Sequence, residues 1–252
     1  MASAATQSAF NNGWSVCTPH VVSNKCEFQS WASNTSLGTL SAEALRDLES
    51  IMTIADYDAG SILFLEQESL SRVYVVLDGD VRLSLQDIGG KRLTIRIAKR
   101  GAVLGMSEAF SGSLSEWSAD TLYPSKIASI KRNDFIRFSE RHTEVYRLAT
   151  MELIRTCSNT YRTLRILGLT CCVRKKLGGQ LLVWAEQGTR MDDQSRFRLA
   201  MSHAQIAEFI GTSRESVSRT LADFRRSKLI EFRGSMVIIP SMAALKEYVE
   251  RR

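Results

Sequence analysis

The chain has 252 residues, is 44% hydrophobic and carries a formal net charge of +6 at pH 7. This size suits one large or two modest globular domains, and the positive charge suits a polyanionic partner. No apolar run approaches the length of a membrane span, and the N-terminus lacks the pattern of a signal peptide. The 5 cysteines are irregularly spaced, which argues against a secreted disulfide framework. We therefore expect a cytoplasmic protein with no membrane partner.

Residues 1–36 form the first predicted segment, an irregular arm rich in Ser, Asn, Ala and Thr. This composition is typical of chain ends that lie outside a packed core. The arm contains one group of residues with a spacing suggestive of metal ligands, Cys17-x2-His20-x5-Cys26.

Residues 37–132 show the pattern of a small β-sheet domain. A short amphipathic helix with a serine cap is predicted at Ser41–Ile51. Strands punctuated by glycine turns follow it, at Ser61–Leu65, Arg72–Leu77, Val81–Gln86, Arg92–Ala98 and Gly101–Met106. Short strands at such regular spacing predict a small β-sandwich or β-roll.

Residues 133–168 are predicted to be helical, because no Pro or Gly interrupts them before Gly168. Four apolar positions follow the 3-4-3 spacing of a coiled-coil seam, namely Ile154, Cys157, Tyr161 and Leu164. This spacing is equally compatible with a dimer helix and with a core helix packed on its own domain. We expect Cys157, Cys171 and Cys172 to be small buried apolar side chains rather than redox centres.

Residues 169–252 form a second, mainly helical domain. An amphipathic helix is predicted at Thr170–Gln187, followed by a polar loop over 188–198 and a strand at Phe197–Met201. Two short helices hinged at residues 210–212 come next. Each begins with the spacing of a capping box, in which a hydroxyl residue is followed three positions later by Gln or Glu. The pairs are Ser202 with Gln205 and Thr212 with Glu215.

The second of these helices has two distinct faces. Val217, Leu221 and Phe224 form a stripe suited to burial. A separate arc near the helix start carries Arg214, Glu215, Ser218 and Arg219, which is how a helix-turn-helix presents base-reading side chains to the major groove. Residues placed to contact the DNA backbone are Ser202, Thr212, Ser213, Arg225 and Arg226. An ordinary helical hairpin with a solvated charged face is the alternative.

Two predicted strands around a glycine turn follow the second helix, at Leu229–Phe232 and Met236–Ile239. A helix-turn-helix followed by such a hairpin is a winged helix. Here the sequence resembles the Crp/Fnr family of bacterial transcription regulators, whose recognition helix carries a pattern close to S-R-E-x-V-x-R. The pattern stands in this chain as Ser213-Arg214-Glu215-Ser216-Val217-Ser218-Arg219, and the resemblance extends over residues 40 to 250.

The resemblance implies an α+β fold made of a β-roll sensor at 37–132, a long dimerisation helix at 133–168 and a winged helix-turn-helix DNA-binding domain at 169–252. It also implies a homodimer that binds double-stranded DNA at an inverted repeat with TGA in each half-site. Such a regulator acts through RNA polymerase and responds to a small-molecule or redox effector. No segment suggests a catalytic site, so no enzymatic activity is expected. The alternative is a ligand-binding or scaffold protein whose helix-turn-helix contacts protein rather than DNA.

The Fnr branch of this family holds an oxygen-sensing iron–sulfur cluster on four thiolates. Three of these come from an N-terminal C-x2-C-x5-C and one comes from the β-roll. This chain has His20 at the middle position of the triplet and Ser125 at the later position. Because a hydroxyl is a poor substitute for a thiolate, we expect no iron–sulfur cluster, no other cofactor and no metal.

The cAMP-binding branch of the family uses a glycine, an acidic residue directly after it, and an Arg-Ser or Arg-Thr pair that holds the cyclic phosphate. Here Gly105 is followed by Met106, while Glu116 and Trp117 stand in the region expected to carry the arginine. A carboxylate at the phosphate position is repulsive. These four residues mark the expected effector pocket, and they indicate an effector other than cAMP.

Overall fold

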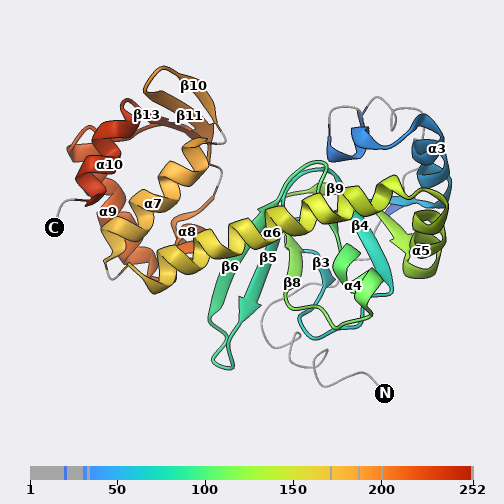
Figure 1. Cartoon of the computed structure of the whole chain (residues 1–252). Helices are drawn as coiled ribbons and strands as arrows, with labels where there is room; N and C mark the ends of the chain where they lie inside the picture. The colour runs from blue at the N-terminus through green and yellow to red at the C-terminus, as the bar shows by residue number, and fades with distance from the viewer. Residues whose placement is uncertain are drawn as a thin grey trace. The chain divides into compact units, whose positions relative to one another are not determined.

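A computed structural model describes residues 20–21, 31–32, 35–170, 172–186, 188–199 and 201–250 (Figure 1). The chain divides into two compact units between residues 159 and 160. Cys17 and Cys26 lie outside the described residues, and of His20 only the backbone is described. Among the described helices, none combines the length and the apolar character that crossing a bilayer requires.

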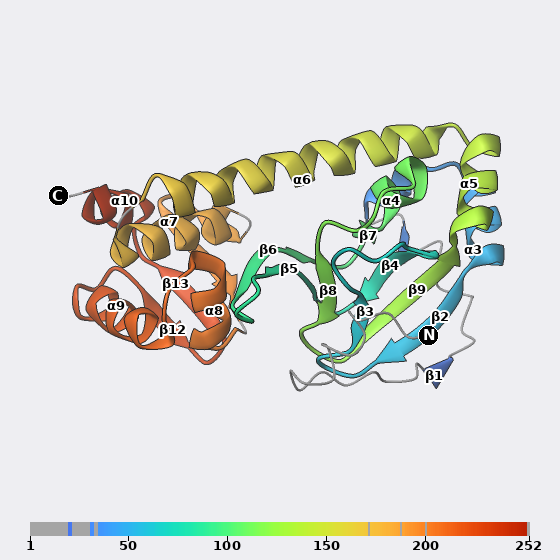
Figure 2. The same ribbon diagram turned by 90° about the horizontal axis from the view of Figure 1, so that it is seen from below.

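The first unit is built on two antiparallel sheets, as expected for a β-roll. One sheet has the spatial order β1 (His20–Val21), β2 (Thr53–Tyr57), β9 (Ser125–Lys131), β4 (Arg72–Asp78) and β7 (Val103–Leu104). The other has the order β3 (Ile62–Phe64), β8 (Ser118–Thr121), β5 (Val81–Gln86) and β6 (Arg92–Ala98). In Figure 2, β2, β9 and β4 lie side by side, in agreement with their hydrogen-bond register.

The alternation of side chains along β4 explains why the first unit has two apolar cores. Val73 and Val75 point into a core shared with helices α3 (Ala42–Ile51), α5 (Arg132–Arg141) and the start of α6 (Glu144–Gly168). Val76 points the opposite way, into the core that fills the space between the sheets. Successive residues of a strand face opposite sides, so β4 closes both cores at once.

Several predicted elements of the first unit are confirmed. β5 and β6 have the predicted bounds, and α3 begins after Ser41, whose hydroxyl accepts a hydrogen bond of 3.1 Å from the Ala44 amide. The strand predicted at Gly101–Met106 is wrong beyond Leu104. Gly105 adopts a left-handed φ of 82° and ends the strand, and the unpredicted helix α4 (Met106–Ser111) begins directly after it.

The helical region predicted at 133–168 consists of two helices, α5 and α6, which are separated at His142 and Thr143. Phe135 and Phe138 of α5 are buried in the helix-covered core, and so are Val145 and Leu148 of α6. Because all four side chains must reach the same core, the chain bends between the two helices. His142 holds the bend through a contact of 2.9 Å between its Nε2 and Asp47 of α3.

Beyond its first turns, α6 turns apolar side chains to solvent. The exposed fractions are 53% for Ile154, 69% for Tyr161 and 65% for Leu164, and Cys157 is exposed as well. The prediction that these four residues form a dimer seam is therefore compatible with the single chain, in which no described segment covers them. The prediction that Cys157 and Cys172 are buried is wrong for the single chain, because both side chains are exposed. Cys171 lies outside the described residues.

The described part of the second unit contains, besides the end of α6, four helices and one sheet. The helices are α7 (Val173–Glu186), α8 (His203–Ile210), α9 (Arg214–Arg226) and α10 (Met242–Glu250). Helix α7 packs against both the sheet and the other three helices. The antiparallel sheet has the order β10 (Thr189–Met191), β11 (Gln194–Arg198), β13 (Met236–Ile239) and β12 (Glu231–Arg233). The predicted loop at 188–198 is wrong, because most of it forms the β10–β11 hairpin. The strand predicted at 197–201 lies three residues earlier, since Ser195 and Phe197 are the residues that turn inward.

Candidate nucleic-acid interface and effector pocket

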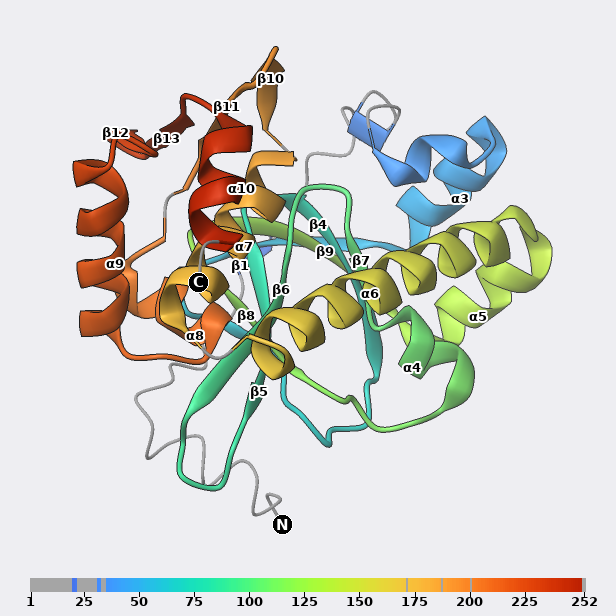
Figure 3. The same ribbon diagram turned by 60° about the vertical axis from the view of Figure 1, so that its left-hand side comes forward.

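The two short helices of the second unit, α8 and α9, lie side by side (Figure 3). The capping box predicted at the start of α8 is confirmed, because Ser202 and Gln205 each accept a hydrogen bond from the other's backbone amide. Gly211 ends α8 with a left-handed φ of 60°. This conformation is easy for glycine and reverses the chain into the next helix.

The capping box predicted for Thr212 and Glu215 is wrong, because α9 begins one residue later. The N-cap is Ser213, whose hydroxyl accepts from the Ser216 amide at 3.3 Å. Thr212 is occupied with the end of α8, where its backbone amide donates to the Ala207 carbonyl at 3.1 Å. Thr212 therefore contributes to the end of α8, and Ser213 caps the start of α9.

The two faces predicted for α9 are present. Val217, Leu221 and Phe224 are buried. On the other face, the side chains of Arg214, Glu215 and Arg219 are exposed, and none of them forms a hydrogen bond or ion pair with any other residue that the structure describes. Two guanidinium groups and a carboxylate are therefore available for external partners on the first turns of the helix.

Ser218, the fourth residue of the predicted arc, is half-buried and has a protein partner. Its Oγ lies 2.7 Å from Nδ1 of His203, the first residue of α8. His203 is exposed in the first turn of α8, and the sequence gives no sign of this contact.

The residues predicted to contact the DNA backbone differ in their surroundings. The hydroxyls of Ser202 and Ser213 serve as N-caps, and Thr212 is half-buried in the turn. Arg225 and Arg226 are exposed near the end of α9, where Arg226 forms an ion pair with Asp223 one turn earlier. An exposed pair of this kind contributes at most about 1 kcal/mol, so Arg226 can exchange its partner.

The wing predicted after α9 is present, with β12 and β13 joined at Gly234, which has a φ of 60°. Its first strand begins at Glu231 rather than Leu229, because Leu229 and Ile230 are buried before the strand starts. β13 also pairs with β11, so the wing belongs to the four-stranded sheet.

The first unit contains a pocket of about 600 Å³ between the roll and α6. Three aromatic side chains line it, Phe110, Trp117 and Tyr146, together with aliphatic residues from β5, β7, α4 and α6. Volumes of this order are typical of small-molecule sites. Gly105, Met106 and Trp117 line the pocket as the sequence predicts, but Glu116 is exposed and is not one of the lining residues. The serine before it, Ser115, is the buried one, and this turns the glutamate outward.

The polar groups of this pocket are residues that sequence reasoning did not assign to it. Arg96 of β6 forms an ion pair with Glu152 of α6, and its Nη1 donates to Thr156 Oγ1 at 3.0 Å. Both charged side chains are largely buried, with exposed fractions of 13% and 11%. Glu108 of α4 also lines the pocket. Arg96 is the one cation among the lining residues, and its charge is already balanced by Glu152.

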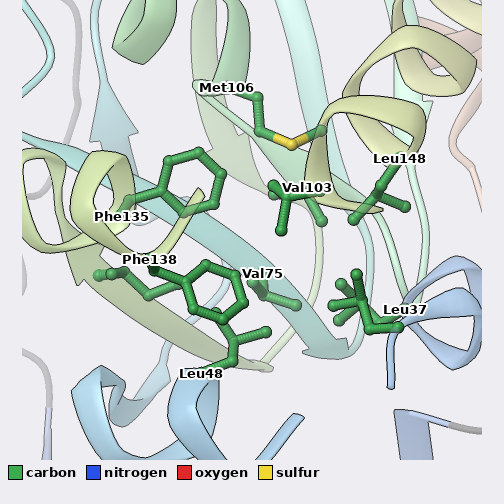
Figure 4. Close-up of a pocket in the computed structure, with 11 residues that line it drawn as sticks. Leu37, Leu48, Val75, Val103, Met106, Phe135, Phe138 and Leu148 are labelled. Carbon is green, nitrogen blue, oxygen red and sulfur yellow. The ribbon is translucent and has the colours of Figure 1, made fainter. Parts of the chain in front are cut away.

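A second cavity in the first unit is too small for an effector. Its volume is about 10 Å³, and its lining is entirely apolar. Figure 4 shows Phe135, Phe138, Leu48 and Leu148 pointing toward one another around it, with Met106 above them. Such a space holds one water molecule at most, and an apolar cavity stays dry. It is a packing gap of the core.

Two sequence models match the chain in the order that the structure shows. The cyclic nucleotide-binding domain matches residues 54–142, and the Crp-like helix-turn-helix domain matches residues 175–248. The chain belongs to the Crp/Fnr family of transcription regulators. The α+β fold expected from the resemblance is thereby confirmed, with its β-roll, long helix and winged helix-turn-helix.

Named relatives of this Crp/Fnr chain are also regulators. It is 28% identical over 204 residues to the transcriptional activatory protein AadR of Rhodopseudomonas palustris, covering 81% of each chain. It is 29% identical over 189 residues to the nitrogen fixation regulation protein FixK of Bradyrhizobium diazoefficiens, covering 75% of this chain and 78% of that one. The solved structure of FixK2 from Bradyrhizobium japonicum has the same fold, with a TM-score of 0.68, 20% identity and coverage of 78% and 96%.

Ser125, which the sequence resemblance matches to the β-roll thiolate of the Fnr branch, has a structural role in this chain. It is the first residue of β9, is buried, and donates from Oγ to the Tyr123 carbonyl at 2.7 Å. It also packs so closely on Gly79 that a Cβ added to that glycine would lie 2.1 Å from Ser125 Oγ. The hydroxyl is thus buried against the turn between β4 and β5 rather than exposed as a ligand. Among the described residues, no group of three or more His, Cys, Asp and Glu side chains could hold a metal ion.

Proposed function

We propose that this Crp/Fnr regulator reads an inverted repeat in double-stranded DNA through the exposed arc of α9, as a dimer joined along α6. The observation that carries the proposal is the state of Arg214, Glu215 and Arg219. All three are charged, exposed and without partners among the described residues, on a helix whose opposite face is buried. A helix that contacted another protein would have no reason to present these charges in this arrangement.

The arc suits a particular base pair. Arg219 can donate two hydrogen bonds to O6 and N7 of a guanine, which is the commonest specific contact in the major groove. Glu215 lies one turn before it and can accept from N4 of a cytosine. We assign the G·C pair of a TGA core to these two residues, and we assign a guanine outside that core to Arg214, which gives GTGA as the preferred half-site.

The dimer follows from the apolar residues that α6 leaves exposed. Ile154, Cys157, Tyr161 and Leu164 recur at the 3-4-3 spacing of a coiled-coil seam and are exposed, with no cover from the described part of the chain. A second copy that places the same residues against them would bury this stripe in a two-fold interface. Two recognition helices would then enter successive major grooves about 34–36 Å apart. The bound dimer would act on transcription through RNA polymerase.

The pocket beside α6 favours an uncharged, largely apolar effector over cAMP. A cyclic phosphate needs an available cation, whereas Arg96 is held by Glu152 and Thr156. An anion would have to displace the largely buried Glu152 carboxylate from Arg96 and leave it with only the more exposed Arg155 at 3.8 Å, which is costly. The aromatic side chains of the lining suit a flat apolar molecule instead.

Selection of bound duplexes from a random pool with the purified protein tests the DNA assignment. We expect an inverted repeat of GTGA half-sites about one helical turn apart. Arg219→Ala should weaken binding by about 1–3 kcal/mol per half-site and relax the preference at the guanine of TGA. Arg225→Ala is the control and should weaken all sequences alike. Selected sites without an inverted TGA repeat, or equal weakening of specific and random DNA by Arg219→Ala, would refute the assignment.

Two measurements test the effector and cofactor assignments. Calorimetry should detect no cAMP binding at micromolar concentration. DNA binding that appears only with cAMP would contradict the assignment of an uncharged effector to this pocket. Protein purified without oxygen should be colourless. A brown preparation with stoichiometric iron and sulfide that bleaches in air would contradict the role given to Ser125.

A further inference from the structure

His203 and Ser218 are the one pair among the described residues that joins the first helix of the helix-turn-helix to the predicted base-reading arc by a side-chain hydrogen bond. His203 occupies the first position of α8 and Ser218 the fifth of α9, and the distance from Nδ1 to Oγ is 2.7 Å. The histidine side chain is exposed and Ser218 is half-buried. The contact therefore lies at the surface that would face DNA, not in the core.

The packing of the two helices does not depend on this contact. Ile206 and Ile210 of α8 are buried, and so are Val217 and Leu221 of α9. Burial of large aliphatic side chains contributes about 1.5–3 kcal/mol each, whereas an exposed neutral hydrogen bond adds little to stability. The effect of the contact should therefore appear in what Ser218 offers to a partner.

A serine hydroxyl has one proton and two lone-pair sites. If the proton is donated to Nδ1 of His203, the lone pairs face the groove and can accept from the amino group of adenine or cytosine. If Nδ1 donates instead, the hydroxyl proton faces the groove and can bond to O4 of thymine or O6 of guanine. A serine without such a partner rotates freely and serves both kinds of base.

We propose that His203 is a specificity-determining residue, which holds Ser218 as a hydrogen-bond acceptor at the base pair just outside the TGA core. The first helix of a helix-turn-helix crosses the DNA backbone, so the ring's Nε2 meets phosphate oxygens, which only accept. A neutral ring then carries its proton on Nε2 and presents a bare Nδ1 to Ser218. In the GTGA half-site, Ser218 accepts from N4 of the cytosine opposite the outer guanine. This inference rests on the DNA-binding function proposed above.

The test uses variants that separate the hydrogen bond from the bulk of the ring. His203→Asp puts an acceptor-only oxygen at the position of Nδ1, and a carboxylate suits the first turn of a helix. His203→Gln puts its amide one bond further out and loses the contact. The two His203 variants and Ser218→Ala are each assayed by letting duplexes that differ only at the outer base pair compete for binding to the protein.

We expect His203→Gln and Ser218→Ala each to lower discrimination at the outer pair by about twofold to tenfold per half-site, as for one hydrogen bond. The double variant should lose no more than either single one, because the residues act as a unit. His203→Asp should bind every sequence more weakly but keep the preference at the outer pair. Thermal stability and the preference for TGA should not change.

Unchanged outer-pair preference in His203→Gln would overturn the proposal, and so would a loss in His203→Asp equal to that in His203→Gln. Additive losses in the double variant would also overturn it, because the residues would then act independently. These failures are distinct from failure of the DNA-binding function itself. In that case the wild-type protein would select no inverted repeat at all.

Discussion

Gly178 and Gly179 are adjacent in α7, yet the structure gives them opposite responses to the same substitution. A Cβ added to Gly178 would lie 2.1 Å from Val249 Cγ2 of α10, which is far inside van der Waals contact. A Cβ added to Gly179 would meet nothing closer than Ile166 Cγ1 at 4.0 Å. Gly178→Ala must therefore push α7 and α10 apart, whereas Gly179→Ala fits without movement.

The magnitudes follow from two terms. Replacing glycine by alanine within a helix stabilises it by about 1 kcal/mol, and this gain is common to both sites. Overpacking a buried contact costs about 1–3 kcal/mol, and this cost falls on Gly178 alone. The difference between the two variants isolates the steric cost, so Gly178→Ala should be about 1–3 kcal/mol less stable than Gly179→Ala.

Native-state hydrogen exchange of the α7 and α10 amides measures this difference in the whole protein, because it reports the free energy of local opening. The amides of Gly178→Ala should exchange about 5 to 150 times faster than those of Gly179→Ala. Shortening the opposing side chain with Val249→Ala should remove most of the gap. Equal protection in the two glycine variants would refute the assignment of close packing between α7 and α10.

Three further predictions concern the caps and the titrating groups. Ser213→Ala should destabilise the second unit by about 0.5–2 kcal/mol in urea unfolding through loss of the α9 cap, and Thr212→Ala, which removes no cap, should cost less. Burial raises the pKa of Tyr74 to about 12. Its contribution to the free energy of unfolding is therefore complete below the ordinary tyrosine pKa of about 10 and is lost as the pH rises through about 12. Between these two pH values, Tyr74→Phe should lose less of its free energy of unfolding than the wild type. The Ser241 hydroxyl holds the pKa of Asp193 below its ordinary value of 3.8. Ser241→Ala should thus lower the urea concentration at the unfolding midpoint at neutral pH. The difference from the wild type should shrink as acid protonates Asp193.

Local patterns in the sequence were sufficient to predict the elements that carry their own signal. The apolar stripe of α9, the glycine turn of the wing and the alternation of β5 are all short-range features, and the structure has them at or near the predicted bounds. β8 was missed because its short run is polar and its buried Asp120 is paired with arginines of other strands, Arg82 of β5 and Arg92 of β6. Such a strand has no recognisable pattern without its neighbour.

The candidate sites were predicted unevenly for the same reason. The charged arc lies on one helix, so its spacing is visible in the sequence. The polar end of the pocket joins Arg96 of β6 to Glu152 of α6, which lie 56 positions apart in the sequence, and no local pattern links them. The contact between His203 and Ser218 depends on how two helices cross. The start of α9 was misplaced by one residue because two hydroxyl residues, Thr212 and Ser213, compete for the cap.

The pairing of β11 with β13 limits how the DNA-reading part of this chain can be transplanted. A fragment beginning at Ser202 would keep α8, α9 and the wing but would lack β11, and β13 would present an unpaired edge to other molecules. It would also lack α7, against which α10 packs at Gly178. The shortest DNA-reading fragment that keeps these contacts therefore begins at the start of α7 and runs to the end of α10. Chimaeras meant to exchange sensors between regulators should be joined before Val173.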